Sequence, residues 1–382
     1  MLALISVVFV FCTSNAYIVR HEPDILLGTD LVLTFLVHRH GDRTPVPQYV
    51  NFSDQQEQLE ELTKPIGFGQ LTDAGKRRAY ELGNFIRTRY GEFLSPQYNR
   101  SEIYLRSTDS TRAKMTILVE MAGAYSSDGH GWSEDVNWVP VPYTTMPLQY
   151  DFLMGMNCPK FMEHFDKISR SSVPEMQKHS SVIDRLSSIL KIDLRSRPVQ
   201  IYFAYDVFVS QISMGLPVKP SIQEMMPEIK MAADTAFDLL FGLNQTMLPL
   251  QAGLLLKEFF EVSFAAVDGE SSPKVRIYSG HDVNVYALEA ISRVTPQGSP
   301  LYAALFALEL RKVRETGRYV VLPVYVSSPG EPVQYLQVKG CDLLCDLNRF
   351  YEITSPDLID VDEWKLRCNY DRNAKFNTNG FE

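Results

Sequence analysis

The first third of the chain alternates between short apolar runs and longer amphipathic stretches. Residues 31–37 form a nearly continuous apolar run, which is typical of a strand buried on both faces. Residues 72–90 carry apolar positions at helical spacing behind a Thr-Asp cap. A second strand is expected at 103–105, and the segment from Ser107 to Ser110 should cap a helix that runs to about residue 124. This alternation predicts an α/β layer with a parallel sheet, in which chemistry lies at the carboxyl ends of the strands.

The middle of the chain, from 126 to 260, has a different pattern. It is rich in proline at first and then helical, and it contains no strongly apolar strand. We expect helices at 182–192, 201–214 and 225–241, with Pro227 near the start of the last one. We interpret this region as a mainly helical insertion or cap domain.

Strand patterns return in the last third. We expect a strand at 275–278, a helix at 283–291, a hairpin of 301–311 with 319–326, and a strand at 334–338. The predicted organisation is therefore an α/β catalytic domain made of 17–125 and 261–382, interrupted by the helical insertion at 126–260.

Residues 1–16 have the pattern of a secretory signal peptide. The run from Leu2 to Phe11 is almost wholly apolar, and Ser14 and Ala16 stand at positions −3 and −1 of a cleavage site after Ala16. A buried N-terminal strand or helix is the alternative. No later apolar run approaches the ~18 residues that cross a bilayer. We therefore expect an exported protein without a membrane span.

The composition is that of a globular protein, and its net charge argues against some classes of partner. Of 382 residues, 45% are hydrophobic and 22% are charged, and the formal net charge is −9. An acidic chain of this kind is not expected to bind nucleic acid or an anionic membrane through a basic face. Three sequons are candidate glycosylation sites in an exported protein: Asn51, Asn99 and Asn244.

Four cysteines remain once Cys12 is assigned to the signal peptide: Cys158, Cys341, Cys345 and Cys368. An even number in an exported chain indicates two disulfides, and three pairings are open. A zinc half-site at Cys341 and Cys345 is the rival interpretation. It lacks a second pair of ligands, because no histidine follows His281, so we expect no metal.

Three polar clusters follow three of the predicted strands. They are the segment 39–45 (Arg-His-Gly-Asp-Arg-Thr-Pro), the segment 106–109, and the pair His281-Asp282. Arginine is suited to bidentate recognition of phosphate, and Arg106 at the next strand end could join the two arginines of the first cluster. Several guanidiniums repel one another unless a multiply charged anion lies among them. The clusters therefore predict a phosphate site.

The histidine of the first cluster is a candidate nucleophile. Nearby positive charge disfavours the imidazolium form of His40, and a neutral imidazole can attack phosphorus. Asp282 is then the candidate acid that protonates the leaving alkoxide, and His281 could donate a hydrogen bond to the phosphoryl oxygens. The alternative is that these two residues only cap the helix that follows them. We interpret His38 as structural and Asp42 as part of a local salt bridge.

The motif Arg39-His40-Gly41-x-Arg43-x-Pro45, followed far downstream by His281-Asp282, resembles the histidine acid phosphatases. This branch of the histidine phosphatase superfamily includes lysosomal, prostatic and insect venom acid phosphatases. The resemblance extends over nearly the whole mature chain and includes the segments 71–75, 105–109 and 157–159.

The resemblance implies a phosphoglycerate mutase-like three-layer α/β sandwich with a helical domain beside it. It implies hydrolysis of phosphate monoesters without a cofactor, with His40 as the nucleophile that becomes phosphohistidine and Asp282 as the acid. Arg39, Arg43, Arg106 and His281 would bind the phosphate. The implied disulfides pair Cys158 with Cys368 and Cys341 with Cys345.

The same resemblance implies a secreted or lysosomal location and a homodimer. Two alternatives remain open for the function. One is the same fold tuned to inositol phosphates or lysophospholipids, and the other is a non-catalytic secreted binding protein on this scaffold.

Overall fold

The structure is a computed structural model that describes residues 16–18, 24–125, 132–133, 135–155, 157–241 and 246–373. The predicted signal peptide lies outside these residues except for Ala16, and so does the sequon at Asn244. The side chains of the other two sequon asparagines, Asn51 and Asn99, are exposed, and their glycosylation stays a prediction.

The centre of the molecule is a nine-stranded mixed sheet with the order β1-β8-β7-β6-β2-β5-β3-β4, in which β9 also pairs with β7. The strands are β1 (Ala16–Ile18), β2 (Thr29–Arg39), β3 (Ile103–Ser107), β4 (Thr144–Thr145), β5 (Val275–Gly280), β6 (Leu305–Val313), β7 (Tyr319–Val326), β8 (Gln334–Leu336) and β9 (Cys345–Asp346). The expected parallel sheet exists from β2 through β5 and β3 to β4. The β6–β7 hairpin continues the sheet in antiparallel fashion on the other side of β2.

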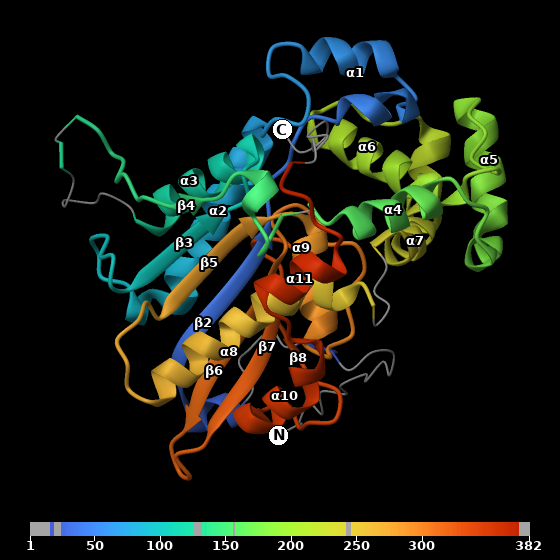
Figure 1. Cartoon of the computed structure of the whole chain (residues 1–382). Coiled ribbons are helices and arrows are strands. Elements are labelled where there is room, and N and C mark those ends of the chain that lie inside the picture. Colours follow the sequence, from blue (N-terminus) through green and yellow to red (C-terminus); the bar gives the residue numbers. More distant parts are fainter. Residues whose placement is uncertain are drawn as a thin grey trace, which may run out of the picture.

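Helices cover both faces of this sheet (Figure 1). On one face lie α2 (Asp73–Tyr90) and α3 (Thr111–Ala124), and on the other lie α8 (Leu254–Val267), α9 (Asp282–Ile291) and α10 (Leu347–Thr354). Successive residues of β2 face opposite layers, so Leu36 packs in the core with α2 and α3, whereas Phe35 and Val37 pack with α8 and α9. The apolar run at 31–37 is therefore part of a strand buried on both faces, as its pattern predicted.

A second group of helices lies beyond the carboxyl end of β2 (Figure 1). It consists of α1 (Gln56–Thr63), α4 (Pro159–Ser169), α5 (Ser180–Leu190), α6 (Ile201–Ser213) and α7 (Pro220–Phe241), and α11 (Val361–Arg367) packs its Trp364 into the same core. We call this set the helical group. Helix α8 packs on the sheet instead, so the helical group ends before the boundary expected at residue 260.

Helix α7 is longer than the sequence pattern indicated. It begins at Pro220, a residue type suited to the first turn of a helix, and not at residue 225. Pro227 lies inside it, although proline removes one backbone hydrogen bond there. The buried neighbours Met225 and Ile229 anchor this stretch in the apolar core, which offsets the local cost.

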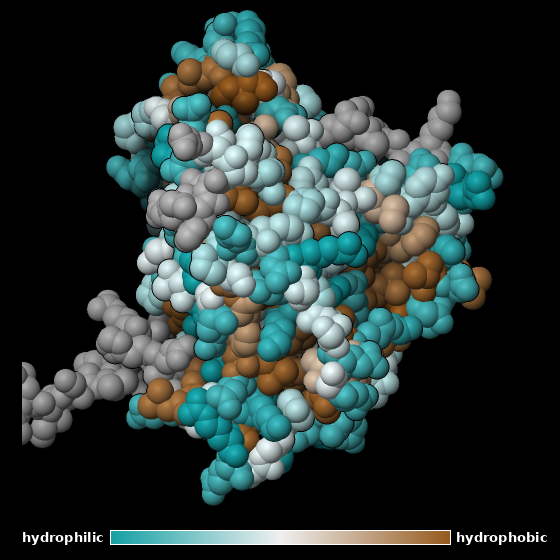
Figure 2. Space-filling model, turned by 90° about the vertical axis from the view of Figure 1, so that its left-hand side faces the viewer, coloured by the Kyte–Doolittle hydropathy of each residue, from teal (hydrophilic) through white to brown (hydrophobic). Residues whose placement is uncertain are grey.

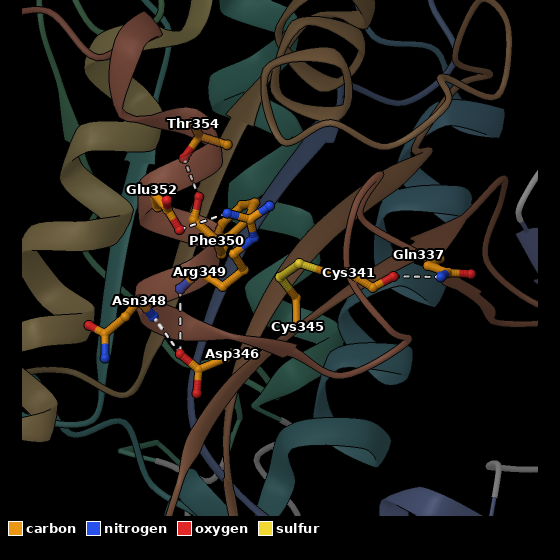
Figure 3. The surroundings of a disulfide bond; sticks show 9 residues. All are labelled: Gln337, Cys341, Cys345, Asp346, Asn348, Arg349, Phe350, Glu352 and Thr354. Carbon is orange, nitrogen blue, oxygen red and sulfur yellow. Dashed lines mark hydrogen bonds and ion pairs between the residues drawn. A yellow bond between two sulfur atoms is a disulfide. The ribbon is translucent and has the colours of Figure 1, made fainter.

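Both disulfides have the pairing that the resemblance implied. Cys158–Cys368 joins the start of α4 to the end of α11. Cys341–Cys345 closes a short loop before α10, and Asp346 beside it caps that helix by accepting hydrogen bonds from the backbone of Asn348 and Arg349 (Figure 3). The zinc alternative is excluded for Cys341 and Cys345, because neither sulfur is available as a thiolate.

Candidate active site

The first polar cluster is held rigidly where β2 ends. The backbone N–H of His40 donates to the carbonyl of Gly280 at 2.9 Å, and its carbonyl accepts from Ala303 N at 3.1 Å. A Cβ on Gly41 would lie 2.5 Å from the carbonyl oxygen of Gly75, which is closer than side chains tolerate. Only glycine therefore allows the first turn of α2 to pack this closely against the loop.

The ring of His40 has a defined tautomer. Its Nδ1 lies 2.8 Å from the carbonyl oxygen of Gly41. A carbonyl oxygen can only accept, so Nδ1 carries the hydrogen and Nε2 carries the lone pair. Burial, together with the positive charge of Arg112 and Arg39, holds the pKa of His40 well below its ordinary value. The result is a neutral imidazole with Nε2 available as a nucleophile.

Three guanidiniums surround this imidazole in a cavity of about 210 Å³: those of Arg39, Arg43 and Arg112. The Nε–H groups of Arg39 and Arg43 are buried and have no hydrogen-bond partner within the described part of the chain. A buried donor without a partner costs free energy, so an anion that accepts from both would stabilise the site.

The protonation of the three arginines is not equivalent. Burial opposes the charge on Arg39 and Arg43, but the carboxylates of Asp282 and Asp206, respectively, outweigh it and raise their pKa. Arg112 differs, because burial and repulsion from Arg43 lower its pKa to about 9. All three are nevertheless cationic at neutral and acidic pH.

The third polar cluster faces the same cavity while beginning helix α9. His281 is the N-cap, and its backbone N–H donates to Asn284 Oδ1 at 2.9 Å. Its Nε2 lies 3.1 Å from the hydroxyl of Thr108, and burial with the charge of Arg112 lowers its pKa well below the ordinary value. The Oδ2 of Asp282 lies 3.1 Å from Arg39 Nη2. The Oδ1 of Asp282 accepts from the backbone N–H of Val283 at 2.9 Å. Both residues therefore satisfy the start of α9 and line the cavity, so the two interpretations are not alternatives.

The structure does not bring Arg106 into this cavity. Its Nη2 lies 2.6 Å from Asp151, and it lines a separate groove with Phe152 and Lys257. Arg112, in the first turn of α3, lines the cavity instead. Side chains alternate along a strand, so a residue at a strand end can face away from the site, whereas the first turn of the following helix lies over that end. The available signal was an arginine just after the expected cap Ser110.

Two further residues of the site, Tyr202 and Asp206, come from helix α6 and were not predicted. They are four positions apart and therefore share one helix face. The Tyr202 hydroxyl donates to Asp282 Oδ2 at 3.0 Å. Asp206 bridges two arginines, with Oδ1 3.2 Å from Arg39 Nη2 and Oδ2 2.7 Å from Arg43 Nη2.

His38 and Asp42 are structural, as expected. His38 Nε2 lies 2.8 Å from Glu120 Oε2, and both side chains are completely buried. Asp42 accepts from Arg78 Nε at 2.5 Å and from the hydroxyl of Ser213 at 2.7 Å. These contacts fix the loop that carries the first cluster to α2, α3 and α6.

Comparison with known proteins places this site in context. Residues 31–189 match the family model of the histidine phosphatase superfamily (branch 2). Human testicular acid phosphatase is 30% identical over 350 residues, which cover 87% of this chain and 81% of that protein. Human lysosomal acid phosphatase is 29% identical over 367 residues, covering 90% and 84%.

Among solved structures, the phytase of Hafnia alvei in complex with tartrate superposes with a TM-score of 0.63 at 14% identity, covering 89% of this chain and 98% of that one. At this identity the likeness concerns the fold alone.

Proposed function

Because the chain belongs to branch 2 of the histidine phosphatase superfamily, we propose that it hydrolyses phosphate monoesters through a covalent phosphohistidine on His40. The observation that carries the proposal is the neutral His40 ring, whose Nδ1 is hydrogen-bonded to a carbonyl. Beside it lie two buried Nε–H groups, those of Arg39 and Arg43, that have no hydrogen-bond partner among the described residues. A phosphoryl group would satisfy those donors and present its phosphorus to Nε2.

In the first step, the lone pair of Nε2 forms a bond to phosphorus as the bond to the ester oxygen breaks. Arg39, Arg43, Arg112 and His281 line the space in which charge develops on the phosphoryl oxygens. Asp282 in its acid form gives its proton to the leaving oxygen, and the alcohol departs. Arg112 takes the role that the resemblance assigned to Arg106.

In the second step, water attacks the phosphorus, the P–N bond breaks, and the electron pair returns to Nε2. The Asp282 carboxylate accepts the proton of the water, which restores the acid for the next turnover. Inorganic phosphate then leaves.

Activity at acidic pH follows from the opposite needs of the two groups. His40 must be neutral and Asp282 must carry a proton. Low pH populates a carboxylic acid, and it would ordinarily also protonate histidine. Burial and the cationic neighbours lower the pKa of His40, so its imidazole stays neutral at mildly acidic pH, where an ordinary histidine is protonated.

The test is the replacement of each reacting group. We expect His40→Ala to abolish hydrolysis of an activated aryl phosphate. Asp282→Ala should slow cleavage by about 10²–10⁴-fold for alkyl phosphates and much less for activated aryl esters, which need no acid. Rapid alkaline quench with ³²P-labelled substrate should trap phosphohistidine in wild type only. His179→Ala is the control, because this histidine is the N-cap of α5 and does not line the cavity. Near-normal rates in His40→Ala would overturn the proposal.

We also propose that the protein is lysosomal or secreted and that it forms a homodimer. One relative is named as a lysosomal acid phosphatase. Within the described residues, no helix is both long and apolar enough to cross a membrane. Figure 2 shows hydrophobic patches on the face that looks outward at the β4 edge, and the segment 132–150 exposes Trp132, Trp138 and Met146. Such patches are suited to an interface between copies.

A further inference from the structure

The charges that line the cavity nearly cancel. Three guanidiniums, those of Arg39, Arg43 and Arg112, face two carboxylates, those of Asp206 and Asp282, and among the described lining residues there is no lysine. His40 and His281 are neutral, because burial lowers the pKa of each. The site therefore has one net positive charge when Asp282 is ionised, and two when Asp282 is in its acid form.

Asp206 is the carboxylate that the proposed chemistry leaves unchanged. In the proposed chemistry Asp282 alternates between acid and base, whereas Asp206 touches two guanidiniums and takes no part in proton transfer. Its side chain is 9% exposed and lines the cavity, so its charge reaches the substrate through little water.

The rest of the cavity wall is mostly apolar. Tyr49 and Phe203 stack with ring centroids 4.0 Å apart, and Phe165 and Phe241 extend this wall. Phe203 is the residue after Tyr202 on α6, so the helix that carries Asp206 also carries part of the aromatic wall. A leaving group that enters this space exchanges water for apolar surface and a fixed negative charge.

We propose that Asp206 is a specificity-determining residue of this site. It favours monoesters whose alcohol is neutral or cationic, and the aromatic wall favours aromatic alcohols among them. It disfavours substrates that carry a second anionic group near the reacting phosphate. The inference rests on the proposed function and names the substrate class of that same site. The phosphoryl group itself is bound in every substrate, so its repulsion from Asp206 cancels when substrates are compared. Only the charge of the leaving group distinguishes them.

The expected size of the effect follows from Coulomb's law. Two unit charges about 8 Å apart at an effective dielectric constant near 20 change a relative rate by about thirtyfold, and salt reduces this to about tenfold. A penalty of about tenfold in kcat/KM is therefore expected for each extra anionic group near the site. Polyphosphorylated alcohols such as inositol hexakisphosphate carry several such groups, so their kcat/KM should be reduced further.

The experiment compares three aryl phosphates whose phenols have similar acidity: 4-methylphenyl phosphate (neutral), tyramine phosphate (cationic) and 4-(carboxymethyl)phenyl phosphate (anionic). For wild type we expect kcat/KM to be about tenfold lower for the anionic ester than for the neutral one, with the cationic ester at least equal to the neutral one. In Asp206→Asn the anionic ester should gain about tenfold in kcat/KM relative to the neutral one, and the cationic ester should gain nothing, whatever the absolute rate. The kcat/KM for inositol hexakisphosphate should also rise relative to that for the neutral ester.

Asp184→Asn is the matched control, because it removes the same charge from an exposed ion pair on α5. It should keep the wild-type order. An unchanged ratio of anionic to neutral ester in folded Asp206→Asn would overturn the inference.

If Asp206→Asn does not fold, wild type alone decides, since equal rates for the three esters, or a difference that does not shrink with added salt, would also overturn it. Failure of the proposed function looks different, because hydrolysis of the neutral ester would then not depend on His40.

Discussion

At the scale of single residues, the site depends on which N–H donors of Arg39 and Arg43 are not used by the protein itself. Arg39 uses Nη1 for the carbonyl of Pro300 and Nη2 for carboxylates, and Arg43 uses Nη1 for the carbonyl of Thr44 and Nη2 for Asp206. Each guanidinium is thus oriented by the protein at its far end. The Nε–H group of each arginine can then donate to an anion. Because the guanidiniums are already oriented, substrate binding costs less conformational entropy.

Arg112 and Arg106 provide a test of this picture. Arg112→Ala removes a cation from the cavity, and we expect kcat/KM for an aryl phosphate to fall by about 10²-fold or more. Arg106→Ala should leave kcat/KM within a few-fold, although it removes the cationic partner of the buried Asp151 and lowers stability. Steady-state kinetics at a temperature where circular dichroism shows both variants folded is the measurement. An equal loss in both variants would contradict the assignment.

At the scale of elements, a buried ion pair between β2 and α3 supports the segment 39–45. His38, two residues before His40, lies 2.8 Å from Glu120, and neither side chain is exposed. Burial opposes charge on His38, but the Glu120 carboxylate and its hydrogen bond outweigh burial and raise the pKa of His38. The pair joins the strand that carries His40 to the helix that carries Arg112.

We expect Glu120→Gln to lower the free energy of unfolding by about 3 kcal/mol at pH 5, because it leaves a buried imidazole without its counter-ion. The pKa of His38 is higher in the folded state than in the unfolded state. The stabilisation is therefore complete below about pH 6.5 and is lost as pH rises through the folded value. Urea unfolding at pH 5 and pH 9 should show the larger difference at pH 5. Glu331→Gln, at an exposed carboxylate, is the control, and a difference that grows with pH would refute the argument.

At the scale of the whole molecule, the cavity lies where the sheet and the helical group meet. The sheet supplies His40, Arg39 and Arg43, and the helical group supplies Asp206 and the aromatic wall. The disulfide Cys158–Cys368 joins α4 to the end of α11 across a sequence separation of 210, whereas Cys341–Cys345 spans only 4.

The two disulfides should therefore contribute unequally. Loop-closure entropy gives about 5 kcal/mol for the long loop and about 2 kcal/mol for the short one as upper values. We expect Cys158→Ser with Cys368→Ser to lower the free energy of unfolding more than Cys341→Ser with Cys345→Ser. Denaturant unfolding of the two double variants under oxidising conditions measures this. The reverse order would show that strain or local packing decides instead.

Local sequence was sufficient for much of this protein. Short-range patterns predicted several elements, because burial and capping depend on near neighbours. These elements are the strand that ends at Arg39, the helix caps at Thr72 and Ser110, and the start of the helix at His281-Asp282. The motif residues at strand ends could be placed together, because parallel strands share one carboxyl edge.

Only the tertiary structure decided which arginine faces the cavity and which carboxylate opposes the positive charge there. Arg106 and Arg112 are six residues apart, and the direction of each side chain depends on how β3 joins α3. Asp206 meets Arg43 across 163 residues of sequence. That contact arises from the packing of α6 over the end of β2, and no local periodicity encodes it, because a carboxylate on a helix looks the same in sequence whether it faces water or two guanidiniums.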